Sequence, residues 1–147
     1  MLGLFTHIPA MVWAQTSQAD VSARVAGMYD FRFEAGQAHY EAMAGPGYTR
    51  FTIYAKSADG SYSLKIAFSD QGLLKTQFAV PEEADCAFVV RKTGKTQRFQ
   101  EHLNGTVHID KLNADELVGR FHFYAAMQDA TENHLRVKGR FVFASPL

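Results

Sequence analysis

Leu117-Val-Gly-Arg-Phe-His-Phe-Tyr-Ala-Ala126 alternates apolar and polar side chains over most of its length, the pattern of a strand with one buried face. Two similar stretches flank it, Gly105-Thr-Val-His-Ile-Asp110 before it and Leu135-Arg-Val-Lys-Gly-Arg-Phe-Val-Phe143 after it. Short polar gaps separate the three stretches, so we expect consecutive antiparallel strands with one apolar and one solvated face. The alternation predicts that four phenylalanines are buried: Phe121, Phe123, Phe141 and Phe143.

The same period-two pattern runs through the chain ahead of this block. Residues 25–34, 48–55 and 62–68 alternate in this way, and Asp59-Gly60 between the last two is a hairpin turn signal. Asn104-Gly105 is the strongest two-residue hairpin signal of the chain. Further strand signals cover residues 73–80, 86–91, 97–103 and 106–110.

Helix signals are weak. Residues 37–44 are rich in Ala but have no sustained 3.6-residue period, and Gly45-Pro46-Gly47 ends them. We therefore predict an all-β domain, an antiparallel β-sandwich or closed barrel of eight to ten strands. The inward positions are mostly Phe, Ile, Leu and Val, and a filled interior of this kind favours the sandwich over a barrel that holds a ligand.

The composition bounds the class of protein. The chain has 147 residues, with 15 Lys and Arg balancing 15 Asp and Glu, which predicts one domain without net charge. No basic stripe is visible in the sequence, so we expect no nucleic-acid partner. Cys86 is the single cysteine, which excludes an internal disulfide framework or a CxxC metal site. We expect it to be a small buried hydrophobic residue.

The N-terminal segment, residues 1–14, is apolar, lacks Lys and Arg, and is too short to span a bilayer. It ends in Val12-Trp13-Ala14, a pattern like a signal-peptidase site, before a polar spacer. We interpret residues 1–19 as a truncated signal peptide and spacer and residues 20–147 as one β-domain. This interpretation predicts a periplasmic or secreted protein with no transmembrane segment. The alternative is an N-terminal helix or strand that docks on a cytoplasmic domain.

Candidate chemistry is sparse. His108 and His122 fall on polar strand faces, and Glu101 is expected near His108 across the Asn104-Gly105 hairpin. Such groups could bind zinc, but alternation places every polar residue of these strands on that face, so we expect neither a metal nor another cofactor. The sequence contains no Gly-x-Ser-x-Gly elbow, no distinctive carboxylate pair and no phosphate-binding glycine loop. We therefore predict no catalytic residue and no enzyme activity.

Polar residues on the outer strand faces are the remaining candidates for a binding site. Tyr and Arg are the residue types that anchor interfaces, although cross-strand pairing also explains such residues on an ordinary surface. The alternation places these residues in an outer-face patch for a protein or glycan partner: Arg50, Tyr54, His108, Arg120, His122 and Tyr124.

The order of the motifs carries a resemblance. Phe51-Thr-Ile-Tyr-Ala-Lys56 and the hairpin after it are followed by Gly105-Thr-Val-His-Ile-Asp110, by Gly119-Arg-Phe-His-Phe-Tyr-Ala125 and by Gly139-Arg-Phe. Over residues 48–143 the chain resembles uncharacterised bacterial secreted β-sandwich proteins, often lipoproteins, with a G-T-V-x-I … G-x-F-x-F-x-A … G-x-F ending. The resemblance implies an extracytoplasmic antiparallel β-domain and no catalytic residues. The chain lacks the N-terminal cysteine that accepts the lipid in the lipoproteins.

A second resemblance is to lipocalin-type barrels. Gly27-Met-Tyr-Asp-Phe31 is similar to their opening G-x-W strand but contains no tryptophan. The sequence thus leaves three hypotheses: a non-enzymatic extracytoplasmic β-sandwich that binds a protein or glycan, a small lipocalin-like barrel that carries an apolar ligand, or a hydrolase whose site the sequence does not reveal. Open edge strands would also allow a homodimer.

Overall fold

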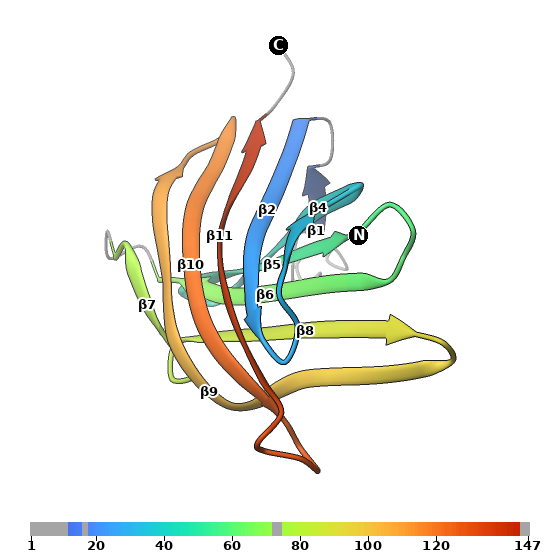
Figure 1. The fold of residues 1–147 in the computed structure, drawn as a ribbon. Helices are drawn as coiled ribbons and strands as arrows, with labels where there is room; N and C mark the ends of the chain where they lie inside the picture. Colours follow the sequence, from blue (N-terminus) through green and yellow to red (C-terminus); the bar gives the residue numbers. More distant parts are fainter. Residues whose placement is uncertain (1–11, 16–17, 72–74, 145–147) are drawn as a thin grey trace, which may run out of the picture.

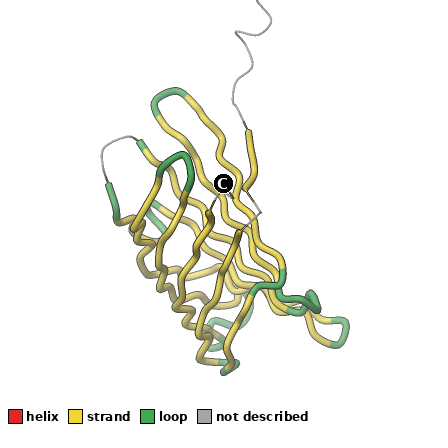
Figure 2. Tube along the Cα trace, turned by 90° about the horizontal axis from the view of Figure 1, so that it is seen from above, coloured by secondary structure: helices red, strands yellow, loops and turns green. Residues whose placement is uncertain are grey.

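The computed structural model describes residues 12–15, 18–71 and 75–144, with side chains from residue 19 onward. Seen from above, nearly all of this chain is strand joined by short loops (Figure 2). The strands in chain order are β1 (Val12–Gln15), β2 (Gln18–Gly27), β3 (Phe31–Glu34), β4 (Gln37–Gly45), β5 (Tyr48–Lys56), β6 (Tyr62–Asp70), β7 (Gln77–Val80), β8 (Ala84–Lys92), β9 (Lys95–Leu112), β10 (Glu116–Met127) and β11 (His134–Ala144).

All eleven strands belong to one antiparallel sheet that forms an open half-barrel. Its order is β1-β4-β5-β6-β8-β9-β10-β11-β2-β3, and β7 pairs with β9 beside this path. The all-β antiparallel prediction is confirmed. The predicted eight to ten strands were too few, because a turn at residues 28–30 divides the strand expected over residues 25–34. The Ala-rich residues 37–44 also form a strand, β4, which pairs along its length with β5.

Strand β9 joins two halves of the sheet, shown crossing one another in Figure 1. We call β4, β5, β6, β8 and the start of β9 the first half, and the end of β9, β10, β11, β2 and β3 the second half. β9 pairs with β8 through residues 95–99 and with β10 through residues 99–112. It bends between these contacts, where His102 has a positive φ of 52°.

The predicted hairpin at Asn104-Gly105 is wrong, because both residues lie inside β9. Gly105 has a φ of 154°, and a Cβ on it would lie 2.1 Å from the carbonyl oxygen of His122 on the neighbouring strand. The glycine therefore permits a bend and a close approach within one strand. By contrast, the predicted turn at Asp59-Gly60 is confirmed: β5 pairs with β6 across it, and Gly60 has a φ of 78°.

The inner faces of the two halves pack on each other and form the core. Phe31 of β3 lies 6.1 Å from Phe88 of β8, and Tyr40 of β4 lies 5.1 Å from Phe143 of β11, between ring centroids. Cys86 is also in the core, 1% exposed, and burial raises the pKa of its thiol. The four phenylalanines predicted to be inside are confirmed as buried: Phe121, Phe123, Phe141 and Phe143.

The N-terminal prediction falls largely outside the described residues. Residues 1–11 and 16–17 are not described, and Val12–Gln15 form β1, paired with β4. The signal peptide therefore stays a prediction. In the part of the chain with assigned structure, no helix has the length and apolar character needed to cross a membrane.

Candidate functional site

The six residues of the predicted patch lie on the outer faces of the sheet, but on both of its halves. Arg50 and Tyr54 are on β5 of the first half. The other four are on β9 and β10 of the second half: His108, Arg120, His122 and Tyr124. Since the inner faces of the halves pack on each other, their outer faces point away from each other. The structure therefore separates the predicted patch into two surfaces.

The outer face of the first half departs from regular alternation. Ile66, Ala67 and Phe68 follow one another on β6 and are 0%, 1% and 0% exposed. Ile66 and Phe68 belong to the core, whereas Ala67 points to the outer side between Thr52 of β5 and Asp85 of β8. A small side chain between taller neighbours leaves the outer face hollow at this position.

One hollow of this face, which we call the β4–β8 groove, has a volume of about 700 Å³. Tyr54 of β5 forms one of its walls, where its ring stacks on His39 of β4 with centroids 5.0 Å apart and an interplanar angle of 25°. These two residues are directly opposite in the sheet, so strand pairing itself holds the stack. Other side chains that line the groove are Glu41, Lys56, Ser63, Lys65, Ala87, Arg91, Arg98 and Gln100.

The chemistry of the β4–β8 groove is that of a binding surface. Ser63 and Ala87 contribute small side chains beside the Tyr54–His39 stack, which offers an aromatic surface. Around them, ammonium, guanidinium, amide and carboxylate groups supply hydrogen-bond donors and acceptors. A groove of this volume lies within the usual range of about 300–1,000 Å³ for small-molecule sites.

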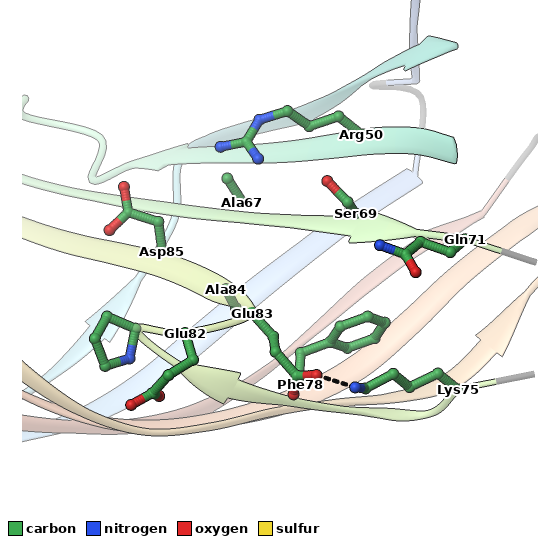
Figure 3. A pocket seen from close by; sticks show the side chains of 11 residues that line it. Arg50, Ala67, Ser69, Gln71, Lys75, Phe78, Glu82, Glu83, Ala84 and Asp85 are labelled. Carbon is green, nitrogen blue, oxygen red and sulfur yellow. Dashed lines mark hydrogen bonds and ion pairs between the residues drawn. The ribbon is translucent and has the colours of Figure 1, made fainter. Parts of the chain in front are cut away.

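A second hollow, of about 350 Å³, lies further along the same outer face around Arg50 (Figure 3). The Lys75 ammonium donates a hydrogen bond to Glu83 at its rim. The Glu83 carboxylate also accepts a hydrogen bond from the Ala79 backbone N–H at 2.9 Å. That backbone bond first, and Lys75 second, lower the pKa of Glu83. The partners of Glu83 thus fix the rim, while Arg50 and Asp85 line the hollow itself.

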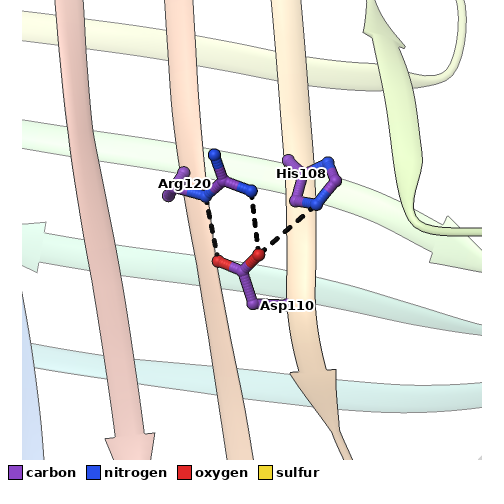
Figure 4. Close-up of polar contacts among 3 residues, drawn as sticks. All are labelled: His108, Asp110 and Arg120. Carbon is purple, nitrogen blue, oxygen red and sulfur yellow. Dashed lines mark hydrogen bonds and ion pairs between the residues drawn. The ribbon is translucent and has the colours of Figure 1, made fainter.

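On the second half, Asp110 connects two of the predicted residues (Figure 4). The Arg120 guanidinium donates two hydrogen bonds to the Asp110 carboxylate, at 3.1 and 2.9 Å. The His108 Nε2 lies 3.3 Å from the same carboxylate. Arg120 lowers the pKa of Asp110, with a smaller contribution from His108, and Asp110 in turn raises the pKa of Arg120. Arg120 thus forms a cross-strand ion pair with Asp110, and His108 lies beside that pair.

The remaining predicted residues do not join this cluster. Tyr124 stacks on His134 of β11, with ring centroids 4.8 Å apart and an interplanar angle of 24°. His122 is exposed and lies opposite Lys138. The zinc arrangement considered for His108 is not formed, because Glu101 pairs with Ala126 within a continuous β9. No group of three or more His, Cys, Asp or Glu suited to a metal occurs among the residues that the structure describes.

Sequence reasoning missed most of the β4–β8 groove, including His39, Lys65 and Arg98. The signal that could have found it is the small residue at outward positions of neighbouring central strands, Ser63 on β6 and Ala87 on β8. Comparison of the chain with protein-family models, with curated proteins and with solved structures finds no match. The resemblances drawn from the sequence therefore stay predictions.

Proposed function

We propose that this protein is a non-enzymatic binding domain that holds a glycan in the β4–β8 groove. The observation that carries the proposal is the hollow beside the Tyr54–His39 stack, about 700 Å³ in volume and bordered by polar and charged side chains. A sugar ring presents an apolar C–H face and a rim of hydroxyl groups. The aromatic surface suits that face, and the side chains of Lys65, Arg98 and Gln100 suit the hydroxyls.

A glycan fits this face better than a protein partner does. The cores of protein interfaces are rich in large apolar and aromatic side chains. The exposed large apolar residues of the described chain are Met28, Met43 and Tyr48, and none of them lines the groove. An exposed surface so poor in apolar side chains offers few anchors for a protein and more for a hydroxylated ligand.

The alternative of a lipocalin-like carrier draws less support from the packing. Phenylalanines from both halves meet in the interior, including Phe33, Phe88, Phe99 and Phe123, each at most 1% exposed. This arrangement favours a sandwich-like filled core over a closed barrel with a ligand cavity. We further propose that the protein acts outside the cytoplasm, in keeping with the signal-like residues 1–14 and with the resemblance to secreted bacterial proteins. N-terminal sequencing of the native protein tests the location, since a product starting at Met1 contradicts it.

The test of glycan binding is a printed array of neutral oligosaccharides, followed by calorimetric titration of the best-bound oligosaccharide. Tyr54→Ala removes one wall of the groove, and we expect its affinity to fall by about tenfold or more. Tyr124→Ala is the matched control, because Tyr124 also stacks on a histidine but on the other half of the sheet. We expect this control to bind as the wild type does.

A second variant separates loss of binding from loss of folding. Ala87→Trp places a large ring at a half-buried position of the groove without removing any core residue. We expect the same melting behaviour as the wild type and no binding to the array. The proposal is overturned if the wild type binds no oligosaccharide, or if a bound oligosaccharide retains its affinity in both Tyr54→Ala and Ala87→Trp.

A further inference from the structure

The outer face of β11 carries a stripe of cations. Arg136, Lys138 and Arg140 alternate with core residues along this strand, and all three side chains are exposed. Strand geometry places them on one face at intervals of about 7 Å. We call these three residues the β11 stripe.

Strand pairing sets further basic residues beside the β11 stripe. Lys138 is directly opposite Arg24 of β2 on one side and His122 of β10 on the other. Arg140 is directly opposite Arg120 of β10. Like charges at directly opposed positions destabilise a sheet, and here ion pairs with Asp30 and Asp110 compensate Arg24 and Arg120 but leave Lys138 and Arg140 uncompensated. An external anion that binds these side chains would neutralise their charge and remove the repulsion.

Acidic side chains of the same face do not neutralise the β11 stripe. Asp110 is engaged by Arg120, Asp30 by Arg24 and Glu34 by Arg32. Asp20 lies opposite Val142, near the end of β11. Among the described residues, no hydrogen bond or ion pair connects a carboxylate to Arg136, Lys138 or Arg140. The side chains without a paired carboxylate therefore form a narrow line along β11, and ion-paired aspartates lie on both sides of it.

We propose that the β11 stripe binds a linear acidic polysaccharide, whose carboxylate or sulfate groups lie along Arg136, Lys138 and Arg140. The line is narrow, and the flanking carboxylates Asp30 and Asp110 would repel a broad anionic surface, so a chain fits better than a membrane. Guanidinium groups donate two parallel hydrogen bonds to a carboxylate or sulfate, which suits the two arginines at the ends of the stripe. The inference goes beyond the proposed glycan groove, because it concerns the opposite outer face.

The surroundings of the β11 stripe favour a polysaccharide over a single-stranded nucleic acid. Proteins that bind single strands usually stack bases on exposed aromatic rings. The aromatic residue beside the stripe is Tyr124, opposite Arg136, whose ring stacks on His134. The face thus supplies charge along a line and one aromatic stack at its end, in place of the series of rings on which successive bases stack.

The experiment measures binding of the full chain to polygalacturonate, which is carboxylated, and to heparin, which is sulfated, over a series of salt concentrations. Binding to either chain should weaken as salt rises, because neutralising a polyanion releases its counterions. We expect Lys138→Glu to lower the affinity by about tenfold and to flatten the salt dependence. Lys95→Glu is the matched control, since it makes the same charge change at an exposed position of the β8–β9 hairpin, and we expect its affinity to change less than about twofold.

Two further probes decide the class of partner. Oligo(dT) of matched length and phosphatidylglycerol vesicles should each bind more weakly than polygalacturonate at equal salt. Stronger binding to either probe overturns the assignment to a polysaccharide, as does equal loss of affinity in Lys138→Glu and Lys95→Glu. Tyr54→Ala distinguishes the two sites, because it should leave polygalacturonate binding at the β11 stripe intact while it abolishes binding in the groove.

Discussion

The two halves of the sheet share one core but present different outer faces. In the second half, β11 alternates strictly, with Leu135 and Val137 fully buried between the exposed Arg136 and Lys138. In the first half, the alternation of β6 is interrupted because outward Ala67 is as buried as its core neighbours. One half therefore has a charged outer face, and the other has a hollowed one. The covered Ala67 lines the hollow around Arg50, so in the first half the interruption on β6 coincides with a depression of the outer face.

The largest effect should come from removing a core phenylalanine in either half. Phe123 of β10 and Phe88 of β8 are at most 1% exposed, and truncating either to Ala should cost about 3–5 kcal/mol. Because the two halves pack one core, each variant should unfold in a single transition in urea, followed by far-UV circular dichroism and by tyrosine fluorescence. Two separate transitions would show that the halves unfold independently and do not share one core.

A smaller effect is expected from crowding the second half. Gly139 of β11 lies between Phe121 of β10 and Ala23 of β2. A Cβ at this position would lie 2.0 Å from the carbonyl oxygen of Ser22 and 2.7 Å from the Ala23 Cα, so the backbone must shift. Gly139→Ala should therefore lower the free energy of unfolding by about 1–3 kcal/mol in urea titration. Wild-type stability in this variant would mean that β2 and β11 approach less closely than described.

The ion pair of the second half should contribute less still. Asp110→Asn should cost at most about 1 kcal/mol at neutral pH, because the pair is partly exposed. Folding lowers the pKa of Asp110 from its ordinary value of 3.8. The ion pair therefore contributes its full stabilisation at pH values well above 3.8, and this stabilisation is lost as the pH falls through the lowered pKa. The difference between wild type and variant in urea unfolding should thus vanish in acid. A difference that grows towards low pH would contradict this assignment.

The smallest effect should have the opposite sign. Lys138→Gln removes a charge that faces Arg24 across the strands, so it should raise the free energy of unfolding by about 0.2–1 kcal/mol at low ionic strength. Added salt should reduce the gain, because exposed charges are screened. Lys65→Gln provides the control for loss of one charge, because Lys65 is exposed and lies opposite Tyr54 and Ala87 and not opposite a cation. A loss of stability in Lys138→Gln would mean that the β11 stripe is not electrostatically strained.

The inner face of the sheet could be predicted from the sequence, whereas the surfaces could not. Alternation assigned Phe121 and Phe141 to the core correctly, because burial of large apolar side chains follows the two-residue period directly. The basic neighbour of the β11 stripe could not be predicted, because Arg24 and Lys138 become neighbours only when β2 pairs with β11. Alternation alone places Arg136, Lys138 and Arg140 on one face, and the expectation that the chain has no basic stripe overlooked this pattern.

Local turn signals were reliable only where the strands on both sides pair with each other. Asp59-Gly60 turns between β5 and β6, and the Asp59 carboxylate accepts a hydrogen bond from the Ser61 backbone N–H at 2.9 Å. Asn104-Gly105 has the same preference for a turn, yet β9 continues through it because β8 and β10 pair with its two ends. Long-range pairing thus overrode the local signal, and with it the expected proximity of Glu101 and His108.

The pairing of β2 with β11 has a consequence for the order of events during synthesis. Val21 and Val25, near the start of the chain, pair with Phe141 and Val137, near its end. Contacts of such high contact order form slowly, and β2 must wait for its partner until the last strand has been made. Until then, the edge of β2 that pairs with β11 is open, so a chain arrested before β11 is expected to depend on chaperones to avoid aggregation.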